Sequence, residues 1–86
     1  MNFVQTKPFR KAFARLARRE QAAVESAMQQ FKVDRLNANL CDHALKGKMK
    51  TLRAFSAGWD LRVIYREEGG FITIILVDVG THNQVY

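Results

Sequence analysis

GWDLRVIYR at residues 58–66 and FITIILVDVG at residues 71–80 are the two most β-rich runs of this chain. The four residues between them, Glu67-Glu68-Gly69-Gly70, form an acidic turn sequence that contains two glycines. Two β-rich runs around a glycine-containing turn are typical of a β-hairpin. We therefore predict a hairpin over the last third of the chain, with the rest of the fold arranged around it.

The two runs differ in how their side chains alternate. Successive side chains of a strand point to opposite faces, so the first run has one apolar face and one largely polar face. The second run is apolar on both faces, which predicts an interior strand that is covered on both sides. The apolar face of the first run holds Leu61, Val63 and Tyr65, and its other face holds Asp60, Arg62, Ile64 and Arg66.

The first part of the chain predicts one strand and two helices. Residues 3–6 are short and β-leaning, Thr6 is a suitable N-cap, and Pro8 suits the first turn of a helix, where its missing N–H is not needed. Two amphipathic stripes with helical spacing follow, and their combined length favours two helices over one. The stripes are Phe9, Ala12, Phe13, Leu16 and Ala17, then Ala23, Val24, Ala27, Met28 and Phe31.

The segments between the helices and the hairpin complete the order β-α-α-β-β-β. Residues 34–45 have no clear period and contain turn-forming Asn and Asp, so we expect an ordered loop there, with a helical turn at its start. Residues 51–56 read as a strand that leads into the hairpin. We predict an α+β fold and a single domain over residues 1–86, with an N-terminal helical hairpin on one face of a small sheet.

Length and composition limit the class of protein. The chain has 86 residues and is 48% hydrophobic, which is typical of one small globular domain. No apolar run approaches the roughly 20 residues of a membrane span, and residues 1–5 lack the pattern of a signal peptide. We therefore expect a cytoplasmic protein without a membrane partner. The single cysteine, Cys41, excludes an internal disulfide and a cysteine-based metal cluster.

Charge is unevenly distributed along the chain. The net charge is +6, and residues 1–50 carry eleven basic and four acidic side chains, whereas residues 51–86 carry three basic and four acidic ones. A basic N-terminal part indicates a polyanionic partner, either a nucleic acid or an acidic protein. A solvated basic surface without a particular partner is the plainer alternative.

Three lysines at alternate positions stand out within this basic part. In an extended chain Lys46, Lys48 and Lys50 would point to one face, and His43 and Arg53 belong to the same segment. Closely spaced cations of this kind favour a phosphate-binding row. Alternatively, they are the solvated lysines that protect an edge strand from aggregation.

Several side chains suit cleavage of RNA without a metal. Such cleavage needs a base for the ribose 2′-hydroxyl, an acid for the departing 5′-oxygen, and cations around the phosphate. Histidine suits both proton transfers near neutral pH, aspartate can serve as a base, and tyrosine can stack on a nucleobase or bind a phosphate. The chain has no phosphate-binding glycine loop and no metal-ligand spacing, so we expect neither a metal nor a small-molecule cofactor. The candidates are His43, Asp60, His82 and Tyr86, with Lys46, Lys48, Lys50, Arg53 and Arg62 as cations.

Each of these residues also has a simpler explanation. His82 could cap the last strand, Asp60 and Arg62 could be solvated or paired beside a turn, and Tyr86 could belong to a frayed terminus. Trp59, next to the same turn, is expected to pack rather than to stack on a ligand.

Four segments in this order resemble the RelE/ParE superfamily of type II toxin–antitoxin toxins. They are Phe9–Phe13 with Leu16 after it, Leu45–Lys48, Asp60–Tyr65 and Val79–Tyr86, and the resemblance covers almost the whole chain. It implies a small antiparallel sheet with an N-terminal helical hairpin. A His before Leu-x-Gly, and a terminal Gly-Thr-His with an aromatic residue four positions later, resemble the YafQ branch, whose members cut mRNA on the ribosome.

The resemblance implies a ribosome-dependent endoribonuclease that leaves 2′,3′-cyclic phosphate and 5′-hydroxyl ends and is held by an acidic antitoxin. It implies His43, Asp60, His82 and Tyr86 in the active site. We expect His82 to act as the acid and either Asp60 or His43 as the base. The YafQ branch has another His where this chain has residues 53–56, Arg-Ala-Phe-Ser. The lysines and arginines are closer to the RelE style, in which basic residues carry most of the catalysis.

Two other functions are compatible with the same fold. One is a ParE-like toxin that inhibits DNA gyrase without cutting RNA, although gyrase binding needs no proton transfer and so gives no role to the two histidines. The other is a basic interaction domain without toxicity.

Overall fold

The computed structural model describes the backbone of residues 1–86 and every side chain except that of Lys48. The predicted strand, helical hairpin and three later strands are all present in the predicted order. The structure adds a two-residue strand and a short final helix, and neither is long enough to leave a periodic pattern in the sequence. The elements are β1 (Asn2–Gln5), α1 (Lys7–Ala14), α2 (Arg18–Val33), the 3₁₀ turn η1 (Ala38–Leu40), β2 (His43–Ala44), the 3₁₀ turn η2 (Gly47–Met49), β3 (Arg53–Ala57), β4 (Leu61–Glu68), β5 (Thr73–Thr81) and α3 (His82–Val85).

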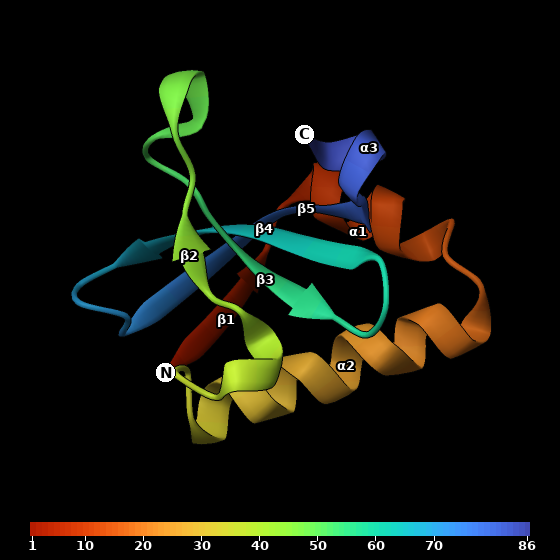
Figure 1. Ribbon diagram of the computed structural model, residues 1–86, viewed down its shortest axis with the longest axis horizontal. Coiled ribbons are helices and arrows are strands. Elements are labelled where there is room, and N and C mark those ends of the chain that lie inside the picture. The colour runs from red at the N-terminus through yellow and green to blue at the C-terminus, as the bar shows by residue number, and fades with distance from the viewer.

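The two long helices begin as the sequence predicts. At the start of α1, the side-chain oxygen of Thr6 accepts a hydrogen bond from the N–H of Phe9 at 3.3 Å, and Pro8 lies in the first turn. Before α2, the N–H of Ala17 donates to Oε1 of Glu20 at 2.8 Å. This bond gives a backbone N–H at the break between the helices a hydrogen-bond partner. The helices therefore form a hairpin, with α2 lying beneath the sheet in Figure 1.

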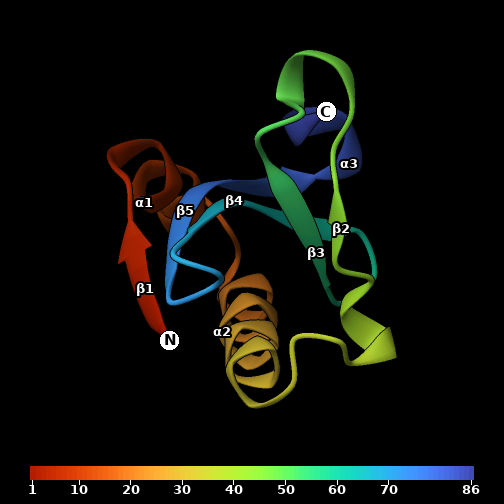
Figure 2. The same ribbon diagram turned by 90° about the vertical axis from the view of Figure 1, so that its left-hand side faces the viewer.

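The five strands form one sheet in the order β1-β5-β4-β3-β2, as Figure 2 shows from the side. The sheet is mixed rather than wholly antiparallel, because β1 pairs with β5 in parallel whereas the other neighbours are antiparallel. The parallel pairing of β1 with β5 is supported by hydrogen bonds at the start of α1. The backbone N–H and the hydroxyl of Thr6 both donate to the carbonyl oxygen of Leu76, at 3.1 and 2.8 Å, and so attach the end of β1 beside the middle of β5.

The helices and the sheet share one core with aromatic rings at its centre. Phe31 of α2 lies 4.9 Å from Phe55 and 5.3 Å from Tyr65, measured between ring centroids, and all three side chains are fully buried. Large buried rings of this kind supply much of the stability of a small domain. The predicted apolar face of β4 is therefore confirmed as its core face, since Leu61 and Val63 are buried in the same cluster as Tyr65.

A β-bulge in β5 changes which of its side chains face the core. Ile64 pairs with Asp78 and Tyr65 pairs with Leu76, so Val77 is an extra residue on β5. The alternation along β5 is shifted by one position beyond Val77. As a result both Leu76 and Val79 lie in the core cluster, although they are separated by an odd number of positions.

We call the side of the sheet away from α2 the outer face. Arg62 points to this face, because it lies between the core residues Leu61 and Val63 on β4. Figures 1 and 2 agree that η2 and α3 rise on this side, with α2 on the other. The outer face is thus flanked by a turn from the middle of the chain and by its last helix.

Two backbone predictions for the segment before β3 need correction. Residues 34–45 contain a helical turn, η1, but it lies in the middle of the segment rather than at its start, and strand β2 was not expected. Residues 46–50 are not extended, because Gly47 has a positive φ of 68° at the start of η2 and Lys50 has a helical backbone. The alternation that would align Lys46 and Lys50 on one face of a strand is therefore absent.

Candidate functional site

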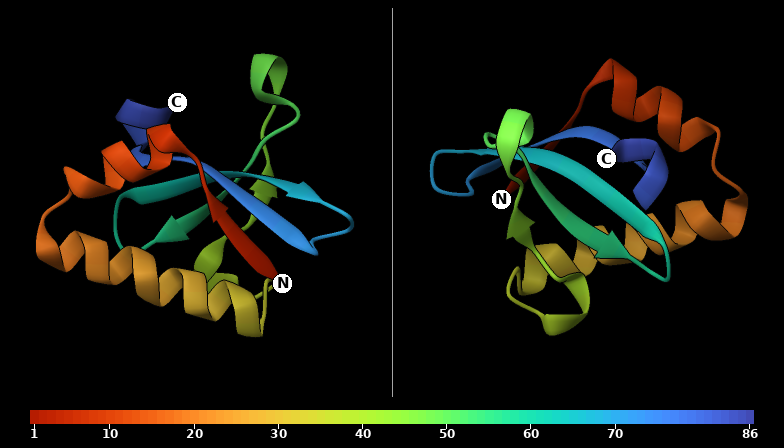
Figure 3. Two further views of the ribbon diagram at one scale, coloured as in Figure 1. Left: turned by 180° about the vertical axis from the view of Figure 1, so that it is seen from behind. Right: turned by 45° about the horizontal axis from the view of Figure 1, so that its top comes forward.

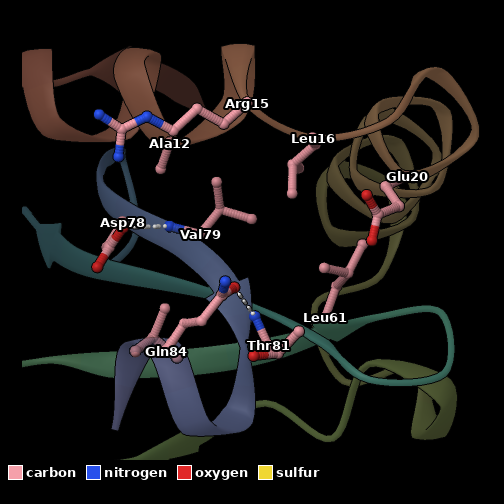
Figure 4. A pocket seen from close by; sticks show the side chains of 10 residues that line it. Ala12, Arg15, Leu16, Glu20, Leu61, Asp78, Val79, Thr81 and Gln84 are labelled. Atoms are coloured by element: carbon pink, nitrogen blue, oxygen red, sulfur yellow. Dashed lines mark hydrogen bonds between the residues drawn. The ribbon is translucent and has the colours of Figure 1, made fainter.

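The end of β5 and helix α3 form a compact unit around Gly80. The N–H of Thr81 donates to Oε1 of Gln84 at 2.8 Å, a bond drawn in Figure 4. A Cβ atom on Gly80 would lie 2.8 Å from that oxygen and 3.3 Å from Cγ1 of Val85. The absence of a side chain at Gly80 therefore lets α3 fold back onto the strand, and His82 becomes the first residue of the helix.

Helix α3 brings His82 and Tyr86 together. Their positions four residues apart place them on the same side of a helical turn, and their rings meet edge to face with 4.5 Å between centroids. Burial raises the pKa of the Tyr86 hydroxyl above its usual value, and the positive charge of Arg62 opposes that rise. Tyr86 is therefore a neutral phenol at physiological pH and can donate a hydrogen bond, with the Arg62 guanidinium close by.

His43 lies on the opposite flank of the outer face. It pairs with Ala54 of β3, which in turn pairs with Ile64 of β4. Its Nδ1 atom lies 2.8 Å from the carbonyl oxygen of Cys41. A carbonyl oxygen can only accept a hydrogen bond, so Nδ1 carries the proton of the neutral ring and Nε2 has a free lone pair.

Asp60 lies in the turn between β3 and β4, with its side chain exposed. The neighbouring Leu61 pairs with Thr81, which precedes His82. Asp60 is therefore at the end of the sheet from which α3 departs, whereas His43 is three strands away from β5. The structure brings Asp60 nearer to α3 than to His43.

Trp59, in the same turn, does not pack as predicted. Its side chain is 98% exposed. Gly58, with a positive φ of 75°, begins this turn and lies close to Ala23 of α2. The turn therefore stays against the helix while the ring of Trp59 remains in solvent.

The predicted cations fall into separate groups. Arg62 lies on the outer face beside Tyr86, and Lys46 and Lys50 are exposed on either side of η2. The side chain of Lys48 lies outside the described residues. Figure 3 shows η2 and α3 as two separate projections above the sheet. Lys46 and Lys50, which flank η2, therefore lie on the same side of the sheet as β2 and His43.

Arg53 does not belong to either group, because its guanidinium joins a buried cluster around Asp42. The Asp42 side chain is 2% exposed and forms ion pairs with Arg35 at 2.8 Å and with Arg53 at 3.0 Å. The hydroxyl of Tyr65 donates to the other carboxylate oxygen, and Nε of Arg53 donates to the Tyr65 hydroxyl at 3.0 Å. The structure thus gives Arg53 a partner inside the fold, which the phosphate-binding prediction did not foresee.

Sequence reasoning missed this cluster because its members are far apart in the chain. Arg35 also lies over the ring of Phe71, with 3.9 Å between its guanidinium carbon and the ring centroid. Asp42 is adjacent to His43, so the cluster attaches the start of β2 to the core. A single aspartate in a segment rich in turn residues carries no signal of such a role.

The pocket drawn in Figure 4 lies beside the end of β5, between α1 and α3, and none of the predicted catalytic side chains lines it. Its walls come from α1 and the turn after it, the start of α2, the start of β4, the end of β5 and α3, and they include Arg15, Glu20 and Asp78. No group of three His, Cys, Asp or Glu side chains among the described residues could hold a metal ion. No helix in the described chain is long and apolar enough to cross a bilayer.

Residues 1–86 match the family described as bacterial toxin of type II toxin–antitoxin system, YafQ. A copper-bound mutant toxin from Helicobacter pylori is 25% identical, with a TM-score of 0.81 over 100% of this chain and 99% of that one. YafQ from Escherichia coli is 18% identical, with a TM-score of 0.82 over 99% and 97%. The toxin–antitoxin complex RelBE2 from Mycobacterium tuberculosis is 20% identical, with a TM-score of 0.76 over 94% and 90%. No curated protein matches the sequence.

Proposed function

This chain belongs to the YafQ family of bacterial toxins of type II toxin–antitoxin systems, and we propose that it acts by cleaving mRNA on the outer face of its sheet. The observation that carries the proposal is the cluster of Arg62, His82 and Tyr86, with His43 on the opposite flank of the same face. This set combines two groups that transfer protons near neutral pH with a cation and a neutral hydroxyl. A protein that only bound DNA gyrase would need no such combination.

His43 is the better candidate for the general base. The hydrogen bond from Nδ1 to the Cys41 carbonyl leaves Nε2 of the neutral ring without a proton. That atom can accept the proton of a ribose 2′-hydroxyl. Asp60 remains the alternative base, and its carboxylate is exposed in a turn with no hydrogen-bond partner among the described side chains.

His82 is the proposed general acid. As an imidazolium it would donate a proton to the departing 5′-oxygen. Arg62 would bind the phosphate and stabilise the negative charge that grows in the transition state, and the neutral hydroxyl of Tyr86 would donate to a phosphate oxygen or orient the RNA. Lys46 and Lys50 would bind flanking phosphates, and Lys48 remains a candidate from the sequence.

The reaction balances with these groups alone. The base removes the 2′-hydroxyl proton, the 2′-oxygen forms a bond to phosphorus, and the bond from phosphorus to the 5′-oxygen breaks. The acid supplies the proton that the 5′-oxygen needs. The products are a 2′,3′-cyclic phosphate and a 5′-hydroxyl, and the acid and base have exchanged protonation states.

The two histidines are well separated, which suits groups that act on opposite sides of one phosphate. Three interstrand steps of about 4.8 Å lie between β2 and β5, which is roughly 14 Å across the sheet. Along the strands His43 is level with Asp78, four residues before His82. Side chains that reach inward from both flanks can contact one phosphodiester between them. We propose that mRNA in the ribosome is presented in this geometry, and that the protein acts in the cytoplasm.

The family implies an antitoxin partner, and RelBE2 is itself a toxin–antitoxin complex. We propose that the antitoxin of this chain is acidic, because the toxin has a net charge of +6. Residues 1–19 contain basic side chains and no acidic ones. A negatively charged partner would associate faster with this surface and would neutralise part of its charge.

The experiment compares His82→Ala, His43→Ala and Asn83→Ala after induction in bacteria. Asn83 is exposed on the same helix as His82 and serves as the matched control. We expect the two histidine variants to lose toxicity and mRNA cleavage, and Asn83→Ala to retain both. Messages mapped after induction should end in 2′,3′-cyclic phosphates.

Two results would contradict the proposal. If His82→Ala stopped growth as fully as the parent does, His82 would not be the acid. If the parent left messages intact but inhibited DNA supercoiling, the protein would be a gyrase inhibitor.

A further inference from the structure

Trp59 is the only tryptophan of the chain, and it is 98% exposed in the turn between β3 and β4. A tight turn usually uses Gly, Asn, Asp, Ser or Pro, each for a backbone reason. Gly58 already supplies the positive φ that this turn requires. Neither the turn nor the core therefore needs a tryptophan here, and the exposed ring is available for contact with a ligand.

The surroundings of Trp59 connect it to the proposed active site. Trp59, Asp60 and Thr81 line one shallow pocket with Arg19 of α2. Thr81 pairs with Leu61 across the sheet and immediately precedes His82. An RNA strand that reaches His82 would pass this end of the sheet if it continued toward α2.

The chemistry around Trp59 suits a nucleotide better than an apolar protein surface. Protein interfaces cluster several apolar side chains around a tryptophan. Among the described side chains, the other large exposed hydrophobic ones are elsewhere: none of them lines either pocket beside Trp59. The ring is instead accompanied by charged groups: the guanidinium of Arg19, which can bind a phosphate, and the carboxylates of Glu20 and Asp60. Glu20 already accepts the N–H of Ala17, so Asp60 is the carboxylate that can accept a hydrogen bond from a nucleobase.

We propose that Trp59 is a stacking platform for one nucleobase of the RNA strand that flanks the scissile phosphate. The proposal rests on the proposed cleavage of mRNA. Stacking on an aromatic ring needs no particular base, because every base has a π face. Trp59 would therefore hold the strand in register, and Arg19 would bind the phosphate of the same nucleotide.

The test is a thermodynamic cycle between the ring and a base. Cleavage on programmed ribosomes is measured with mRNAs that carry one abasic nucleotide at successive positions on either side of the scissile phosphate. We expect Trp59→Ala to lower kcat/KM by about 5- to 150-fold, the usual value of one aromatic–base stack. At one position the abasic nucleotide should lower the parent's kcat/KM similarly and should have no further effect on Trp59→Ala.

Two variants complete the design. Trp59→Phe keeps an aromatic face and should recover most of the rate. Val33→Ala removes another exposed apolar side chain, 86% exposed at the end of α2, and should cleave like the parent. Because Trp59 is so exposed, its substitution should leave the melting temperature unchanged, so a loss of rate cannot come from unfolding.

Several outcomes would overturn the inference while leaving the proposed function intact. One is cleavage by Trp59→Ala at the parent's rate. Another is that, at every abasic position, the abasic nucleotide lowers kcat/KM of Trp59→Ala by the same factor as it lowers that of the parent. Normal cleavage with weakened antitoxin binding would assign Trp59 to the protein partner. If the parent itself cut no mRNA on programmed ribosomes, the proposed function would fail and this inference with it.

Discussion

Replacing Asp42 with alanine tests the buried ion cluster that attaches β2 to the core. The substitution removes the acceptor for the Arg35 and Arg53 guanidinium groups, at 2.8 and 3.0 Å, and for the hydroxyl of Tyr65. Asp42 is 2% exposed, whereas the two arginine side chains are 28% and 26% exposed. The arginines can therefore regain water, but the fully buried Tyr65 is left without its acceptor.

These contacts determine how much stability the substitution is expected to remove. Removing one partner of a fully buried ion pair costs about 3–5 kcal/mol, and partial exposure of the arginines lowers that figure. Leaving a buried hydroxyl unsatisfied costs about 1–3 kcal/mol. We expect Asp42→Ala to lower the free energy of unfolding by about 3 kcal/mol. A domain of this size has a total of roughly 4–13 kcal/mol, so the melting temperature should fall by roughly 12–24 °C.

The assay is urea and thermal unfolding followed by circular dichroism, with Glu68→Ala as the matched control. Glu68 forms an exposed ion pair with Arg66 at 3.9 Å, with side chains 58% and 46% exposed, so its loss should cost less than about 0.5 kcal/mol. The double variant Asp42→Ala/Tyr65→Phe should lose less than the sum of the two single losses, because the groups share a bond. A loss for Asp42→Ala as small as that of Glu68→Ala would refute the reasoning.

Four further predictions follow from the site and the core. Burial, and then the bond to Asp42, raise the pKa of Tyr65 above its usual value near 10; folding therefore retains its proton, and the free energy of unfolding should fall above about pH 10 more steeply in the parent than in Tyr65→Phe. Gly80→Ala should displace α3 and reduce mRNA cleavage, because its Cβ would lie 2.8 Å from Gln84 Oε1; unchanged cleavage would show that α3 can adjust. His43→Ala should reduce cleavage by about 10²- to 10⁴-fold, and cleavage by this variant at the parent's rate would favour Asp60 as base. Tyr86→Phe keeps the ring against His82 but removes the hydroxyl, so it should cleave more slowly than the parent and faster than Tyr86→Ala, an order that single-turnover cleavage would check.

The sequence predicted the elements whose signals are local and periodic. The stripe from Phe9 to Phe31 predicted two helices, and the alternation of Leu61, Val63 and Tyr65 predicted a core face that the structure confirms. These patterns are readable because burial of one face of a helix or strand repeats every few residues. Motif spacing, as in Gly80-Thr81-His82, added the family, which the match over residues 1–86 confirms.

Tertiary structure alone decided how the candidate side chains meet. A turn as short as α3 is not stable by itself; it forms because Gly80 admits Gln84, and only then do His82 and Tyr86 come into contact. The expected row of lysines is absent because the chain forms the turn η2 there. Gly47 has a positive φ, so the backbone is not the extended strand that the alternating lysines predicted. Arg53 has Asp42 as its partner because β2 places that carboxylate next to Tyr65, residues that no local pattern connects.

The strands of the last third of the chain could therefore be predicted from their own sequence. Which of their side chains come together in a site depends on the rest of the fold. Secondary-structure propensity and hydrophobic periodicity depend on residues that are close together in the chain, so the sequence alone reveals them. Contacts between residues far apart depend on the register of the sheet and on the bulge at Val77, and neither is a local feature of the sequence. For the same reason Trp59 and Asp60, adjacent in a predicted turn, could be located in the sequence, whereas their position at the end of the sheet beside α3 required the fold.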